Sequence, residues 1–189
     1  DDGYQVIQNA IDALTAHGGT QTLDGLDMAY DILNAQQNTY GDAYKKGERK
    51  QVVVLFTVGD TDSSPSKVVQ KAKEIKDLGA TVYTVGIFSQ ANGKIVEDNY
   101  HPYWNTQGIT YRPDTYNRDN QGSSANYLMH GISSNYPKAN DYYSGYIYCD
   151  YSKFGEINEN LKKDDGTFTS YFLSASDSSG LNQVFEQIS

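Results

Sequence analysis

Two runs of β-branched and aromatic residues, at 52–56 and 81–88, constrain the fold of this chain most strongly. Between them lies a helical pattern that starts at Ser64-Pro65, ends at Gly79 and carries an apolar stripe of Val68, Val69, Ala72 and Ile75. A strand, a helix and a second strand with short joints form a βαβ unit, which predicts a parallel α/β sheet. Because the first run is continuously apolar, it predicts a strand buried on both faces in the middle of that sheet.

Further segments with regular patterns lie on both sides of this unit. Apolar residues at helical spacing predict a helix over residues 3–17 and a second one from Thr22 to about residue 37, with the Thr22 hydroxyl capping the first turn. A third strand is predicted over 168–175, and Asp177 begins a last helix. A short helix is predicted over 124–132, with an inward face of Leu128, Met129 and Ile132.

Residues 89–168 break the regular alternation and hold most of the 17 tyrosines. Because a structureless connection beyond roughly 15 residues is uncommon in a compact domain, the segment predicts an inserted irregular lobe with its own small core. The α/β core then comprises residues 1–88 and 169–189. Two interpretations of the aromatic side chains stay open: they fill the lobe, or some of them, with Tyr103 and Trp104 as candidates, contact a protein or sugar ligand.

Charge and composition argue against several functions. The chain has 24 acidic and 15 basic residues and a formal charge of -9, so its field repels phosphate backbones and anionic lipids. With no apolar run of about 18 residues either, we expect no nucleic-acid binding and no membrane insertion. The single cysteine, Cys149, rules out internal disulfides and Cys-rich zinc sites. No nucleophile elbow or phosphate-binding loop is present, and we expect no enzyme.

Four phrases, in the same order and at compatible spacing, resemble the second half of a von Willebrand factor type A domain over residues 3–88 and 169–189: GGTQTLDGLDMAYDIL, RKQVVVLFTVGD, AKEIKDLGATVYTVGIF and SDSSGLNQVFEQI. The phrase ANYLMHGISSNYP further resembles the lobe of type A domains in surface proteins and pilus-tip adhesins of Gram-positive bacteria. The resemblance implies a Rossmann-like, doubly wound and mostly parallel sheet, partial in this chain. It also implies a secreted protein of the bacterial cell wall or pilus.

The same resemblance implies a metal-ion-dependent adhesion site at the carboxyl ends of the strands, where Mg²⁺, Mn²⁺ or Ca²⁺ accepts an acidic group of the partner. Thr20 matches the family's threonine ligand, and Thr57 is a neighbour of the site. Val58, however, stands where the family keeps a metal-binding aspartate. The opening helix matches a point past the family's first strand, so the Asp-x-Ser-x-Ser segment that follows that strand lies upstream of this chain or does not exist in it. Two interpretations stay open: Asp60 or Asp62 replaces the lost carboxylate, or both are solvated loop acids that help to cap the next helix.

The resemblance therefore implies a non-enzymatic adhesion or protein-interaction module that binds a host or matrix protein, or a glycan, at the strand ends. The alternative is a metal-free spacer in a surface fibre. In the family, the strand that matches residues 51–57 also pairs with the first strand, which this sequence lacks. Because a bare apolar edge is a template for association, we expect another chain, a symmetry mate or a missing N-terminal half to complete the sheet.

Overall fold

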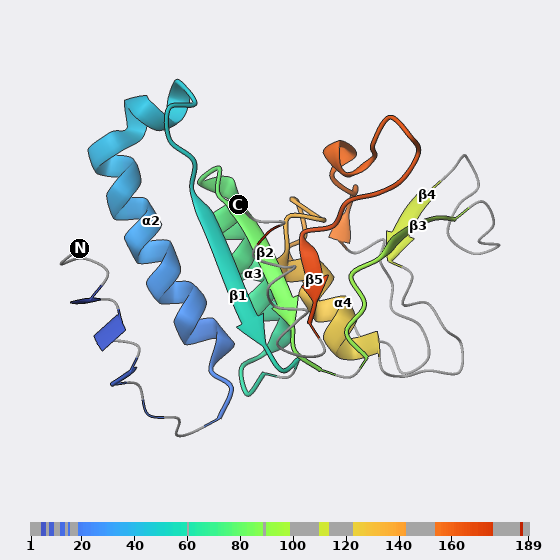
Figure 1. The fold of residues 1–189 in the computed structure, drawn as a ribbon, viewed down its shortest axis with the longest axis horizontal. Coiled ribbons are helices and arrows are strands. Elements are labelled where there is room, and N and C mark those ends of the chain that lie inside the picture. Colours follow the sequence, from blue (N-terminus) through green and yellow to red (C-terminus); the bar gives the residue numbers. More distant parts are fainter. Residues whose placement is uncertain are drawn as a thin grey trace.

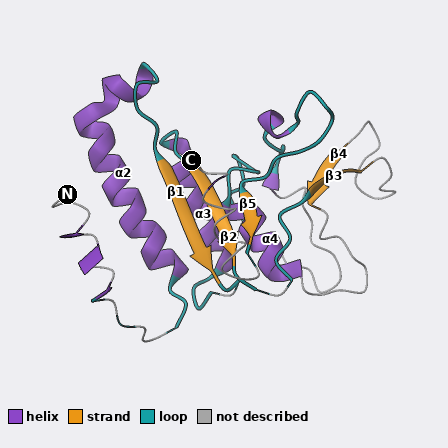
Figure 2. Cartoon of the chain, viewed as in Figure 1, coloured by secondary structure: helices purple, strands orange, loops and turns teal. Residues whose placement is uncertain are grey.

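The computed structural model describes residues 19–59, 61–88, 90–98, 110–113, 123–142 and 154–175, together with residues 5, 6, 8, 9, 12, 13, 15 and 186. Figure 2 shows the helices and strands in these ranges. In chain order they are α2 (Thr22–Lys45), β1 (Val52–Thr57), α3 (Pro65–Asp77), β2 (Thr81–Gly86), β3 (Ile95–Asp98), β4 (Thr110–Pro113), α4 (Ser123–Ile132), the 3₁₀ helix η2 (Glu159–Leu161) and β5 (Phe172–Ser174). None of the described helices is long and apolar enough to cross a membrane.

The main sheet is parallel and has the order β1-β2-β5, as the βαβ pattern predicts. Val52 pairs with Thr81 at one end of β1 and Thr57 pairs with Gly86 at the other. Among the described strands β2 is therefore central and β1 lies at the edge, so the predicted middle position of β1 would require the further strand that this sequence lacks (Figure 1). β3 and β4 form a separate antiparallel pair.

Successive side chains of β1 point to opposite faces of the sheet, and the two faces are covered differently. Val53 and Leu55 pack toward the main core, whereas Val54 joins a small cluster with Val85 on the opposite face. On that opposite face Val52 is 47% exposed and Phe56 is 42% exposed. The prediction that this strand is buried on both faces is therefore wrong, because an apolar run reports side-chain type but not whether a second layer covers it.

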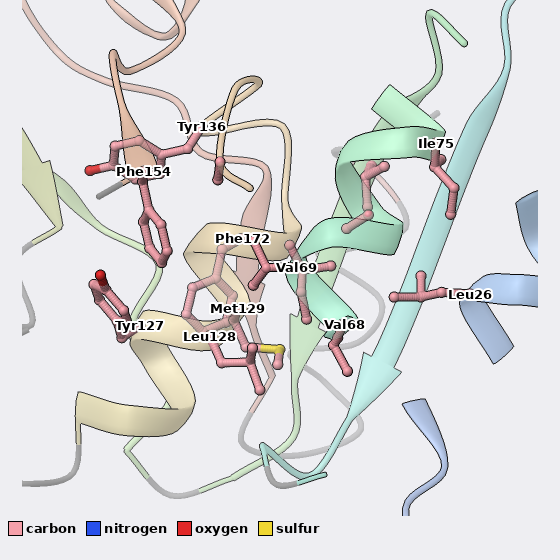
Figure 3. Packing of buried hydrophobic residues seen from close by; sticks show 14 of the residues in the cluster. Leu26, Val68, Val69, Ile75, Tyr127, Leu128, Met129, Tyr136, Phe154 and Phe172 are labelled. Carbon is pink, nitrogen blue, oxygen red and sulfur yellow. The ribbon is translucent and has the colours of Figure 1, made fainter. Parts of the chain in front are cut away.

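One hydrophobic core joins α2, α3 and α4 to the sheet (Figure 3). The predicted stripe of α3 is fully buried, and so is the predicted inward face of α4, formed by Leu128, Met129 and Ile132. Residues of the predicted lobe and of the α/β core belong to the same cluster, so the expected separate core is wrong for the described residues. The boundaries at 88/89 and 168/169 stay a prediction.

Helix α4 is part of the α/β architecture. It follows β2 in the chain, packs on β2 and α3, and precedes β5, which pairs parallel to β2. Parallel neighbours need a crossover connection, and α4 supplies it. The sequence interpretation missed this second βαβ unit because long irregular segments separate the helix from both strands.

The C-terminal end of α4 is fixed by buried polar groups. The Lys76 ammonium of α3 donates to the carbonyl oxygens of Gly131, Ser133 and Tyr136 at 3.0, 3.2 and 2.8 Å. Ser134 then bonds the backbone of Val82 in both directions, each at 2.9 Å. Burial lowers the pKa of Lys76 to about 7, and the neighbouring Asp77 charge opposes that shift. Three donors meeting three carbonyls at a helix C-terminus favour the protonated side chain.

The buried Asn135 links this junction to β5. Its Nδ2 atom donates to His130 Nδ1 and to Ser170 Oγ, both at 2.9 Å, and its Oδ1 atom accepts from the Tyr171 N–H at 2.7 Å. His130 is fully buried, with the Phe172 ring edge-on at 5.0 Å. Burial lowers the pKa of His130 to about 3, and the Asn92 backbone opposes part of that shift.

Most predicted helix and strand boundaries hold, with three corrections. α2 runs to Lys45 instead of about residue 37, with a backbone break at Tyr40, and its N-cap residue is Gln21 without a side-chain bond, so Thr22 does not cap it. β5 is shorter than the predicted strand. In the first predicted helix the described residues from Gln5 to Asp12 are helical, whereas Ala13 lies in a turn and Thr15 in no regular element, so the helix ends before residue 17. Glu186 of the last predicted helix is helical, and the other residues of both helices lie outside the described residues.

Replacing Lys76 by methionine tests the junction between α3 and α4. At about pH 6, where Lys76 is protonated, the Lys76→Met variant should lose about 2–4 kcal/mol of unfolding free energy, because three buried carbonyls lose their donor. Urea denaturation followed by circular dichroism measures it. The matched variant Lys67→Met, at an exposed position of α3, should change stability by less than about 0.5 kcal/mol. Equal effects of the two substitutions would contradict this assignment.

His130 should make the fold sensitive to acid. Its pKa is lower in the folded chain, about 3, than the unfolded value of about 6.5, so the unfolded chain binds more protons between these pH values. Its contribution is complete above pH 6.5 and decreases by up to about 1.4 kcal/mol per pH unit as the pH falls toward 3. The His130→Gln variant should lose less stability between about pH 6.5 and 4.5. Parallel pH profiles of the two proteins would disprove this role.

Candidate binding site at the strand ends

The carboxyl ends of β1, β2 and β5 meet at one edge of the sheet, as they must in a parallel arrangement (Figure 1). Two loops leave this edge: residues 58–64 connect β1 to α3, and residues 87–94 follow β2. The segment before α2, which contains Thr20, lies against the first of these loops. In open parallel sheets this edge is where ligands bind.

Asp62 connects the segment before α2 to the loop after β1. Its Oδ2 atom accepts from the Thr20 N–H at 2.7 Å, and its own N–H donates to the Thr20 carbonyl at 3.0 Å. The Thr61 hydroxyl donates to the same carbonyl at 3.4 Å. A Cβ atom at Gly19 would lie 1.7 Å from Asp62 Oδ2, so only glycine permits this approach. We call these contacts the Asp62 clamp.

The turn after β1 directs one side chain outward. The Thr57 hydroxyl accepts from the Gly59 N–H at 3.1 Å, and Gly59 has a φ of 96°, a conformation that favours glycine. The Phe88 ring packs against Gly59, where a Cβ atom would lie 2.8 Å from it. Val58, between these two fixed residues, is 62% exposed.

The loop after β2 is held by Asn126, a buried residue of α4. Its Oδ1 atom accepts from the Asn92 N–H at 2.9 Å and its Nδ2 atom donates to the Gln90 carbonyl at 2.7 Å. Gly93 packs so closely on β5 that a Cβ atom would lie 1.7 Å from the Phe172 carbonyl oxygen. The loop backbone is thus fixed from below, while Ile87 at its start remains 39% exposed.

Apolar side chains are exposed at this edge, on both neighbouring strand ends. Val58 and Ile87 follow directly after the last pair of the β1–β2 register, and the Ile87 N–H donates to the Thr57 carbonyl at 2.8 Å. Phe56, two residues before Val58, is 42% exposed. We call Phe56, Val58 and Ile87 the strand-end patch.

The structure brings together some of the predicted site residues. Thr20 and Thr57 both lie at the strand ends, as the resemblance implies, and Asp62 is bonded to Thr20. Asp60, Tyr103 and Trp104 lie outside the described residues. Sequence reasoning missed the exposure of Ile87 and the internal bond of Asp62, for which the glycine before Thr20 was the only signal.

The described residues do not fit a bound divalent cation. Hard cations need several oxygen ligands, and Val58 supplies none at the position of the family's aspartate. The Thr57 hydroxyl is buried and bonded to Gly59, and Asp62 already accepts from the backbone of Thr20. Within the described ranges, no three His, Cys, Asp or Glu side chains lie close enough to hold a metal ion.

Two tyrosines of the predicted lobe, Tyr127 and Tyr136, serve as core. Tyr127 stacks on Phe154 with ring centroids 4.2 Å apart, and Tyr136 contacts the same Phe154 ring at 5.3 Å (Figure 3). Both tyrosines are buried. Of the two interpretations of the aromatic residues, packing is therefore correct for these two.

One family model, described as von Willebrand factor type A domain, matches residues 2–111, which is more than half of the chain. No curated protein and no solved structure gives a match. The matched range includes the segment before α2, β1, α3 and β2, and hence both loops of the strand-end edge.

The close approach at Gly19 gives a direct test of the Asp62 clamp. The Gly19→Ala variant should lose about 1–2 kcal/mol of unfolding free energy, because its Cβ atom displaces the Asp62 carboxylate. The matched variant Gly25→Ala, in α2 with no atom within 4 Å of the new Cβ, should instead gain about 0.5–1 kcal/mol. Urea denaturation of both variants measures the difference, and an unchanged stability of Gly19→Ala would show that the clamp does not stabilise the fold.

Proposed function

We propose a function from the premise that this chain belongs to the von Willebrand factor type A family, whose domains are in general protein-interaction or adhesion modules. The chain acts as a non-enzymatic adhesion module of a bacterial cell-surface or pilus protein. It binds a host or matrix protein, or a glycan carried by one, at the carboxyl ends of its parallel strands.

The strand-end patch is the observation that carries this proposal. Val58 and Ile87 expose large apolar side chains on loops whose backbones are fixed by Phe88, Gly59 and Asn126. Exposed apolar groups on a rigid support lose little conformational entropy on binding, which favours recognition of a partner. Their position at the ligand-binding edge of an open parallel sheet supports the same role.

The second candidate, a metal-free spacer in a surface fibre, is favoured by the edge of β1. Among the described residues β1 pairs with β2 alone, and Val52 and Phe56 are exposed on the sheet face away from the main core. An open strand edge recruits another strand through its backbone groups. We propose that another chain, or a missing N-terminal half of the domain, completes the sheet there.

Substitutions in the strand-end patch test the adhesion role. The double variant Val58→Ser, Ile87→Ser should bind at least about tenfold more weakly, because truncating central apolar contacts commonly costs more than about 1.4 kcal/mol. Binding to immobilised collagen, fibronectin and fibrinogen, with a glycan array as a second arm, is measured by surface plasmon resonance. The matched control is Val52→Ser, at the opposite end of β1, which is 47% exposed in the native chain.

Equal loss in the control would show that binding does not depend on the strand ends. If the native chain binds no member of either panel but associates with itself or with an added N-terminal half, the spacer role replaces adhesion. Turnover of ester or glycoside substrates would contradict the proposal that the chain is not an enzyme.

A further inference from the structure

We infer that the strand-end site, resting on the proposed function, works without a cation: the Asp62 clamp holds its loops together, and the partner presents apolar side chains flanked by basic residues. Asp62 is thus a positioning residue, since it acts through Thr20 and the loop backbone. This goes beyond assigning an adhesion module, because it states how the site is held and which chemistry it recognises.

The clamp connects the segment before α2 to the loop after β1, a connection that a shared cation would otherwise make. Asp62 accepts from the Thr20 N–H and donates its own N–H to the Thr20 carbonyl, so both polar groups of the Thr20 backbone are used. The Thr61 hydroxyl adds a second donor to that carbonyl and accepts from the Ser63 N–H at 3.2 Å. A carboxylate that accepts from a backbone N–H gains a charge-assisted bond without needing a metal ion.

Position 58 and the clamp belong to the same loop. Val58 brings no carboxylate to that loop and so adds no charge that a cation would have to offset. Among the described residues of the loop, Asp62 carries the single carboxylate, and that carboxylate is satisfied internally. Gly19, which has no room for a side chain beside Asp62, completes the arrangement.

The partner's chemistry follows from charge and exposure. Without a bridging cation, the carboxylate of a partner would meet a chain of formal charge -9 and would be repelled. Val58 and Ile87 instead offer apolar contact on a chain whose net charge is negative. Apolar side chains surrounded by Lys or Arg on the partner satisfy both features of the site.

Two measurements on the free chain test the clamp. The Tm of the native chain should change by less than about 1 °C between EDTA and millimolar Mg²⁺, Mn²⁺ or Ca²⁺, because a ligand that binds only the folded state would raise it. In EDTA, the Asp62→Ala variant, which has no side-chain acceptor, should exchange the Thr20 amide hydrogen at least about tenfold faster than the native chain, measured by NMR. The matched variant Asp31→Ala, on the exposed face of α2, should leave that rate unchanged.

The Val82 amide, which donates to Ser134 in the core, reports whether each variant is folded. If Asp62→Ala unfolds, Gly19→Ala, which displaces the carboxylate from the Thr20 N–H, gives the same exchange test. A Tm increase of several degrees with any of the three cations would overturn the inference. So would an unchanged Thr20 exchange rate in a folded variant.

A binding arm tests the partner's chemistry with whichever panel protein is bound. Its affinity should be equal in EDTA and in Mg²⁺, should fall when its lysines are acetylated, and should not fall when its carboxylates are amidated. Dependence on Mg²⁺ or on the partner's carboxylates would overturn the inference while leaving the adhesion proposal standing. If no panel protein binds but the cation and exchange results are as expected, the adhesion proposal fails and the clamp is still supported.

Discussion

The fold depends on one buried charge at the end of α4. Lys76 reaches from α3 to three carbonyl oxygens at the point where α4 stops, and so fixes two helices and the direction of the chain that leaves them. Ser134 then accepts from the Val82 N–H of β2, two residues before the part of β2 that pairs with β5. Asn135 accepts from the Tyr171 N–H and so positions the backbone that enters β5. A parallel third strand forms because this junction returns the chain to the correct edge of β2.

The same junction explains the phrase ANYLMHGISSNYP, on which the resemblance to surface proteins of Gram-positive bacteria rests. The stretch from Ile132 to Tyr136 is buried, and its Ser, Ser and Asn side chains bond β2, His130 and the segment before β5. Buried polar groups must be paired, so each of these residue types is required by its partners. This phrase therefore reports how α4 is attached to the sheet, and its role is structural even within an adhesion module.

The sequence predicts the βαβ unit well because three features of α3 agree: the helical spacing of its apolar residues, the proline at its start and the glycine after its end. It fails for α2, whose segment 38–45 contains Gly41 and polar residues yet continues the helix. Tertiary contacts compensate for the low propensity: Gln37 bonds the carbonyl of Leu78 at 2.8 Å, and the Arg49 guanidinium lies 4.1 Å from the Tyr40 ring. The Gln37–Leu78 bond joins segments 41 positions apart, and no local pattern contains it.

The candidate site is predictable in position but not in chemistry. Thr20 and Val58 point to the strand ends because parallel strands must finish at one edge, whereas the partner of Asp62 is a backbone group 42 positions away. Sequence reasoning treated this carboxylate as either a metal ligand or a solvated acid, and the structure assigns it a third role. Support from beneath the loops, by Phe88 on Gly59 and by Asn126 on residues 90–92, involves none of the metal-site positions. A type A scaffold can therefore lack the carboxylate at position 58 and still hold these loops in place, because the Asp62 clamp joins the first loop to the segment before α2 and the layer below supports both loop backbones.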